Sequence, residues 1–183
     1  MTDEFLELLR NDAHKVGQYK LSSGRSSEHY INCKPVILSG KGLAMVSDMI
    51  LDHLEPDTVA VGGLTLGADP LVSGVAMGAH LLDWDLSALI VRKEPKGHGT
   101  GAWIEGPVLP KGSKVVVLED VITTGGSSIK AATRLRDAGY EVNKIVSIVD
   151  RQVNNEADEF MESANLELVS LYKLEDVADA SDE

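Results

Sequence analysis

One stretch near the middle of the chain, residues 114–139, restricts the possible folds more than any other segment. It opens with the apolar run Val-Val-Val-Leu and passes through Glu119 and Asp120 into a turn rich in threonine, glycine and serine. Apolar residues at helical spacing follow, and Gly139 stands where such a helix would stop. A buried strand that leads through a polar turn directly into a helix is the repeating unit of an α/β fold.

Strand-like and helix-like segments alternate along most of the chain. Runs rich in β-branched residues predict strands, and apolar residues at the 3.6-residue period predict helices between them. The predicted strands span residues 58–61, 86–91, 115–118, 145–149 and 166–172, and the predicted helices span residues 69–81, 127–138 and 156–163. This alternation predicts an α/β domain with a central parallel sheet flanked by helices, in which ligands bind at the carboxyl ends of the strands.

The N-terminal part has a different pattern. Apolar spacing predicts a helix over residues 3–16 that Gly17 ends, and a second helix over residues 41–54. Between the two, extended pieces at residues 19–21 and 30–33 flank a Ser/Gly turn, which predicts a hairpin.

Composition narrows the classes of function. Seventeen basic residues against twenty-nine acidic residues give a net charge of -12, so no overall basic surface attracts nucleic acid. A single cysteine, Cys33, fits a reducing, cytoplasmic setting. The acidic N-terminus and the absence of an apolar run of about 20 residues predict no signal peptide and no membrane span. With 43% apolar residues, one domain over residues 1–183 is expected, with residues 179–183 as a solvated tail.

The turn after Asp120 has the chemistry of a phosphate site. Unpaired N–H groups at a helix start point outward, the adjacent glycines allow close backbone approach, and hydroxyl side chains add donors. Glu119 and Asp120 could accept hydrogen bonds from ribose hydroxyls or bind Mg²⁺, but successive strand residues face opposite sides, so both reach one ligand only if the backbone turns there. The alternative is an ordinary strand-to-helix turn capped by Ser127 or Ser128. A mononucleotide P-loop is disfavoured because no Lys-Ser or Lys-Thr follows at its spacing.

A second segment, residues 92–106, concentrates positive charge in an acidic chain. Arg92, Lys93, Lys96 and His98 lie within seven residues, and glycines at alternate positions make the segment supple. Such a segment, called the lid below, could close over an anionic substrate and exclude water. The alternative is an exposed loop with scattered charges.

Both segments resemble known motifs. The run VVVLEDVITTGGS resembles the 5-phosphoribosyl-1-diphosphate (PRPP) signature of type I phosphoribosyltransferases, and RKEPKGHGTG resembles the catalytic loop of orotate phosphoribosyltransferases. Residues 19–30, 61–70 and 149–151 are similar to segments of the same family in the same order. The resemblance implies the type I phosphoribosyltransferase fold, with residues 1–40 contributing a small N-terminal hood.

The resemblance also implies roles for individual residues. Lys96, His98 and Asp120 would be catalytic, and Thr123, Arg151 and Tyr30 would bind orotate. PRPP would be bound by Arg92, Lys93, Lys96, His98, Glu119, Asp120, Val121, Ile122, Thr123, Thr124, Gly125, Gly126 and Ser127. Mg²⁺ would be held mainly through PRPP with no dedicated protein ligand, and the lid would act in the neighbouring subunit of a homodimer.

Two positions depart from the family pattern, and two other functions stay open. Ser22 and Gly67 stand where some relatives carry lysine, which leaves fewer cations for orotate and diphosphate. Asp69 could position Mg-diphosphate, but a cap for the helix at residues 69–81 is preferred. A purine phosphoribosyltransferase would share the phosphate loop but not the lid, and a PRPP-sensing regulator would keep the loop without catalysis.

Overall fold

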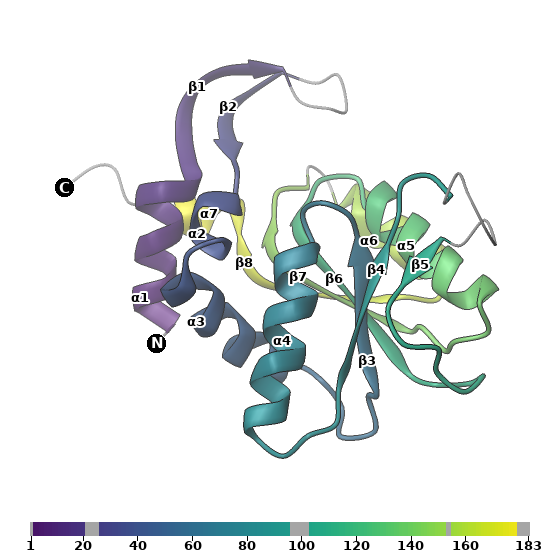
Figure 1. Cartoon of the computed structure of the whole chain (residues 1–183). Helices are drawn as coiled ribbons and strands as arrows, with labels where there is room; N and C mark the ends of the chain where they lie inside the picture. Colours follow the sequence, from purple (N-terminus) through teal and green to yellow (C-terminus); the bar gives the residue numbers. More distant parts are fainter. Residues whose placement is uncertain (1, 21–25, 96–102, 153–154, 179–183) are drawn as a thin grey trace.

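A computed structural model describes residues 2–20, 26–95, 103–152 and 155–178 of the 183-residue chain (Figure 1). A six-stranded sheet forms its centre, in the order β5-β4-β3-β6-β7-β8. The strands are β3 (Ala60–Leu64), β4 (Ser87–Val91), β5 (Ile104–Glu105), β6 (Val115–Ile122), β7 (Lys144–Asp150) and β8 (Glu167–Lys173). All neighbouring strands are parallel except β5, which pairs antiparallel with β4 at the edge. The predicted parallel α/β sheet is confirmed, with one short antiparallel strand added.

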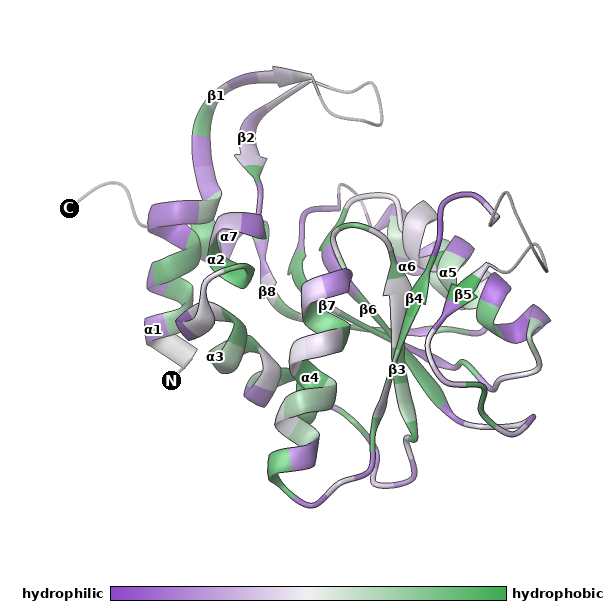
Figure 2. Ribbon diagram, in the orientation of Figure 1, coloured by the Kyte–Doolittle hydropathy of each residue, from purple (hydrophilic) through white to green (hydrophobic). Residues whose placement is uncertain are grey.

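Helices cover both faces of the sheet, so the molecule has two apolar cores. Residues of α1 (Thr2–Leu8), α3 (Gly40–Leu51) and α4 (Asp69–Leu81) pack on one face, and those of α5 (Gly126–Asp137) and α6 (Glu156–Ser163) on the other. Side chains of β6 alternate between the two, since Val116 and Leu118 enter the first core and Val115 and Val117 the second. Figure 2 shows the resulting hydrophobic centre of the sheet.

The N-terminal hairpin stands away from this body (Figure 1). Strands β1 (His14–Lys20) and β2 (Ser26–Ile31) form a separate antiparallel sheet, which confirms the predicted hairpin, although both strands are longer than predicted. The helical segment ends at Ala13, after a π-helical turn over Leu9–Ala13, and not at Gly17, which lies within β1. The prediction was wrong there because pairing with β2 overrides the helical pattern: His14 and His29 contact each other across the hairpin, Nε2 to Nδ1, at 2.9 Å.

Several short elements carry no periodic signal and were not predicted. These are α2 (Lys34–Ile37), β5 and α7 (Leu174–Ala178). Strand β6 also continues four residues beyond its predicted end, through both acidic residues to Ile122, because it stays paired with β7 as far as the Ile122–Asp150 register. Within the described residues, no helix has the length and hydropathy needed to cross a bilayer.

Candidate active site

The phosphate loop lies where β6 ends and α5 begins. A cavity of about 110 Å³ is lined there by Glu119, Val121, Ile122, Thr123, Thr124, Gly125, Gly126, Ser127 and Ser128. All but Ser128 are predicted PRPP-binding positions. The cavity combines hydroxyl side chains with the unpaired N–H groups of a helix start, which is the composition of an anion site.

Gly125 gives the loop its shape. It precedes α5 with φ 75°, a left-handed conformation that favours glycine. A Cβ at this position would collide with the Met161 side chain of α6 and lie 3.7 Å from that of Ala157. The loop therefore rests directly on α6, and both its conformation and its packing require glycine.

The two acidic residues of β6 have different hydrogen-bond partners. Glu119 is buried toward α5 and accepts a 3.0 Å hydrogen bond from Ser128 Oγ. Burial, together with the charge of Asp120, raises the pKa of Glu119 to about 8. Asp120 Oδ2 lies 2.9 Å from Lys34 Nζ at the start of α2. Strand β6 continues through both residues to Ile122, and the joint binding of one ligand by Glu119 and Asp120 stays a prediction.

Lys34, which was not predicted from the sequence, contacts the predicted site residue Asp120. It begins α2, directly after the hairpin, and pairs with a carboxylate 86 positions further along the chain. Burial lowers its pKa, but the hydrogen bond and charge of Asp120 outweigh burial, so the net pKa is raised. The adjacent Cys33 is also buried near the end of β6, and burial raises the pKa of its thiol.

Arg151 lies at the carboxyl end of β7, beside the phosphate loop. Its backbone N–H donates to Ile122 O at 2.9 Å, and Nη2 donates to His29 O of the hairpin at 3.3 Å. The residue is 7% exposed, and within the described part of the chain its Nε has no hydrogen-bond partner. Burial lowers its pKa, and Tyr30 opposes that shift. A buried guanidinium with an unused donor indicates an acceptor supplied by a ligand.

Tyr30 and Thr123, the other predicted orotate-binding residues, lie on different elements. Tyr30 is on β2, is 39% exposed, and stacks on Tyr19 with ring centroids 5.1 Å apart. Thr123 belongs to the phosphate loop and lines its cavity. The hairpin and the sheet thus both contribute to the region around Arg151.

The base of the lid is held by the body of the protein. Arg134 of α5 donates to the backbone carbonyls of Arg92 and Lys93, and its guanidinium lies 3.7 Å from the ring centroid of Trp103. The Arg92 side chain pairs with Glu105 at 3.1 Å, and Lys93 is exposed. Neither side chain lines the phosphate cavity. Lys96 and His98 lie outside the described residues, as does the 21–25 turn with Ser22.

Asp69 does not cap α4. Its Oδ2 accepts a 2.7 Å hydrogen bond from Thr65 Oγ1, four residues earlier, and the residue before the helix, Ala68, makes no side-chain cap. Asp69 therefore fixes the turn after β3 and does not satisfy the N–H groups of the helix.

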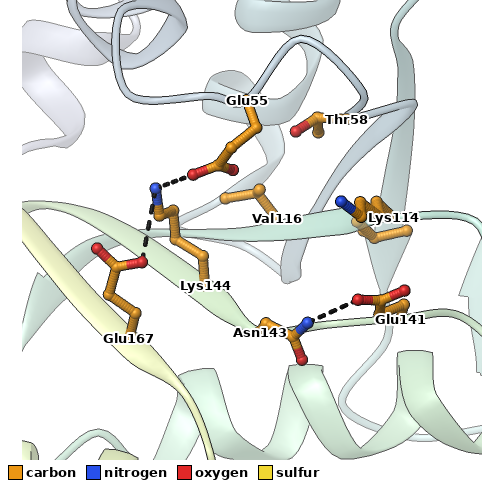
Figure 3. A pocket seen from close by; sticks show the side chains of 9 residues that line it. Glu55, Thr58, Lys114, Val116, Glu141, Asn143, Lys144 and Glu167 are labelled. Atoms are coloured by element: carbon orange, nitrogen blue, oxygen red, sulfur yellow. Dashed lines mark hydrogen bonds and ion pairs between the residues drawn. The ribbon is translucent and has the colours of Figure 1, made fainter.

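A second pocket lies at the opposite, amino-terminal ends of β6 and β7 (Figure 3). Lys144 pairs there with Glu55 and with Glu167, and Asn143 donates to Glu141 at 2.8 Å. These side chains satisfy one another, and ligands of parallel sheets bind at the other end of the strands. We therefore assign this pocket a structural role.

Comparisons with known proteins agree with the geometry. The phosphoribosyl transferase domain family matches residues 50–170. Orotate phosphoribosyltransferase of Thermosynechococcus vestitus is 52% identical over 177 residues, 97% of this chain and 93% of that protein. Two crystal structures of Mycobacterium tuberculosis orotate phosphoribosyltransferase resemble the chain. The complex with Fe(III) dicitrate has a TM-score of 0.81 and 33% identity, covering 97% of this chain and 98% of that one. The complex with PRPP has a TM-score of 0.77 and 31% identity, covering 96% of this chain and 98% of that one. The chain belongs to the phosphoribosyltransferase domain family and, within it, to the orotate phosphoribosyltransferases.

Proposed function

We propose that the chain transfers the 5-phosphoribosyl group of PRPP to orotate and releases orotidine 5′-monophosphate and diphosphate, the nucleotide-forming step of pyrimidine synthesis. One observation carries the choice of substrates. A cavity of phosphate-binding composition and a buried guanidinium with an unused donor lie at the same end of neighbouring strands, β6 and β7. The first suits the 5′-phosphate of the donor, and the second suits the carboxylate of the acceptor.

The phosphate loop would anchor the donor while its bond to diphosphate breaks. Backbone N–H groups and the hydroxyls of Thr123, Thr124 and Ser127 would hold the 5′-phosphate. Glu119 and Asp120 would accept hydrogen bonds from the ribose hydroxyls. Holding the ribose in place aligns its C1 carbon for attack by the pyrimidine nitrogen. No covalent intermediate on the protein is required, because positive charge on the ribosyl centre and negative charge on the leaving group develop together.

The leaving diphosphate would be stabilised by the lid. We infer that Arg92, Lys93, Lys96 and His98 bind it electrostatically, in a site from which closure excludes water. In the structure neither Arg92 nor Lys93 lines the phosphate cavity of its own chain, and Arg92 pairs with Glu105. This arrangement supports a homodimer in which each lid serves the partner's site.

Mg²⁺ suits this site as a partner of the substrate. Among the described residues, no group of three or more His, Cys, Asp or Glu side chains could form a protein cage for a metal. The carboxylate of Asp120 and the threonine hydroxyls are oxygen donors of the kind that Mg²⁺ prefers, and they fit an ion held mainly by PRPP oxygens. Bound in this way, Mg²⁺ supplies positive charge to the leaving diphosphate.

A base-selection assay tests the proposal. Purified protein with PRPP and Mg²⁺ is expected to consume orotate, followed by its ultraviolet absorbance, and to leave hypoxanthine and adenine unchanged. Conversion of a purine base without orotate would replace the proposal with a purine enzyme. PRPP binding without conversion of any base would identify a regulator.

The Arg151→Gln variant tests the acceptor site separately. The amide removes the buried charge, so the KM for orotate is expected to rise at least roughly tenfold while the KM for PRPP changes little. Equal changes in the two KM values would contradict the assignment of Arg151 to orotate.

A further inference from the structure

Lys34 connects the hairpin side of the molecule to the end of β6. Its ammonium lies 2.9 Å from Asp120 Oδ2, and its side chain is 38% exposed against 12% for Asp120. A pair this open to solvent contributes little to folding stability. It can nevertheless fix the direction of the carboxylate.

Gly67 leaves the space into which the Asp120 carboxylate fits. A Cβ at residue 67 would lie 2.6 Å from Oδ1 and 2.9 Å from Oδ2 of Asp120. Any side chain at residue 67 would therefore displace the carboxylate. Oδ1 also accepts a 3.0 Å hydrogen bond from the Val121 N–H, so contacts from three segments define one position for this group.

The charge around Asp120 gives Lys34 particular importance. The neighbour of Asp120 on β6 is another acidic residue, Glu119. The other titratable groups that act on Lys34 are Cys33 and Tyr30, and neither side chain carries a positive charge. Within residues 2–20, 26–95, 103–152 and 155–178, Asp120 forms a single ion pair, and its partner is Lys34. A side chain at residue 67 would occupy the space of the carboxylate, whereas Lys34 of α2 supplies a cation 2.9 Å from it.

We propose that Lys34 is a positioning residue for phosphoribosyl transfer, and that it holds the Asp120 carboxylate in the space left by Gly67 so that it faces the ribose of the donor. The inference rests on the proposed function, because it assigns Asp120 to the ribose hydroxyls. Lys34 acts through Asp120 and stays clear of the reacting atoms.

A double-mutant cycle with Asp120→Asn tests this role. Lys34→Met is expected to lower kcat/KM for PRPP roughly tenfold in the wild-type background and to have almost no further effect in the Asp120→Asn background. Lys34→Arg keeps the charge and is expected to restore most of the activity. Equal losses from Lys34→Met in both backgrounds would overturn the proposal, because Lys34 would then act independently of Asp120.

Two further variants separate positioning from folding. Lys41→Met removes a cation that pairs with Glu4 on the exposed side of α3 and is expected to leave kcat/KM unchanged. Gly67→Ala displaces the carboxylate without altering Lys34, and its loss of kcat/KM is expected not to add to that of Lys34→Met. Additive losses from these two substitutions would also count against the proposal.

Assaying the wild-type protein beside the variants separates a failure of the proposed function from a failure of the role of Lys34. Wild-type protein that consumes no orotate with PRPP and Mg²⁺ would end the proposed function. If the wild-type protein is active and the folded Lys34→Met variant, checked by thermal unfolding, has the same kcat/KM, only the proposed role of Lys34 is overturned.

Discussion

At the scale of single residues, the adjacent carboxyls of Glu119 and Asp120 have opposite surroundings. Asp120 is paired with a cation, whereas Glu119 is buried against α5 beside a hydroxyl. The raised pKa of Glu119 means that the folded protein holds a proton that the unfolded chain releases between the ordinary value of 4.5 and about 8. The stability that this group contributes is fully present below pH 4.5 and is lost as the pH rises through the folded-state pKa.

Glu119→Gln removes this titration and retains an acceptor for Ser128. We expect the free energy of unfolding of the variant, relative to wild type, to rise by at least about 1 kcal/mol between pH 5 and pH 9. Urea unfolding at several pH values measures it, with Glu162→Gln, an exposed change on α6, as the matched control. A difference that is constant with pH would show that Glu119 titrates as an exposed carboxyl does.

The residues of the phosphate loop could be found from the sequence because they are contiguous and their chemistry is local. Thr123, Thr124 and Ser127, which the sequence predicts to bind phosphate, line one cavity. Lys34 could not be found in this way, since its partner is 86 positions away and a lone lysine in a short helix carries no signal. Arg151 was predicted by resemblance alone, because the burial that leaves its Nε without a partner among the described residues arises only in the fold.

At the scale of elements, long periodic segments were predictable and short or paired ones were not. The β6–α5 unit follows its pattern because apolar strand residues and a helical stripe must both be buried. The start of β1 was misjudged because its residues suit a helix until β2 pairs with them. The predicted strand at residues 115–118 ended too early for a similar reason, because pairing with β7 keeps the chain extended through Glu119 and Asp120.

The contact between the phosphate loop and α6 predicts unequal effects at two adjacent glycines. Gly125→Ala requires a left-handed alanine and a Cβ that collides with Met161, so we expect a loss of about 1–3 kcal/mol of stability and weaker PRPP binding. Gly126→Ala is the matched control for stability, because among the described residues its Cβ would meet only Thr124 Oγ1 at 3.8 Å. Urea unfolding and the KM for PRPP measure both variants. Similar losses at the two positions would mean that α6 does not support the loop.

At the scale of the whole molecule, the two cores on opposite faces of the sheet hold the strand ends in place. The phosphate loop rests on the α5–α6 side, and the Asp120–Lys34 pair lies on the side of α2. The hairpin then reaches Arg151 through His29 O. The phosphate loop, the Asp120 carboxylate and the Arg151 guanidinium of this chain therefore lie at the same end of the sheet, whereas neither Arg92 nor Lys93 lines its phosphate cavity.

That division predicts that two impaired variants restore each other when they are assayed at an orotate concentration far below the KM of wild type. If each lid serves the partner subunit, a mixed dimer of Lys96→Ala and Arg151→Gln chains contains one site with both residues intact and one site with neither. Random exchange between equal amounts makes half of the dimers mixed, so recovery of about a quarter of wild-type activity is expected after unfolding and refolding the variants together. If each lid closed over its own site, every site in every dimer would keep one defect and the mixture would stay as inactive as its components. Refolding each variant alone is the control, because any activity gained there would come from refolding and not from exchange of subunits.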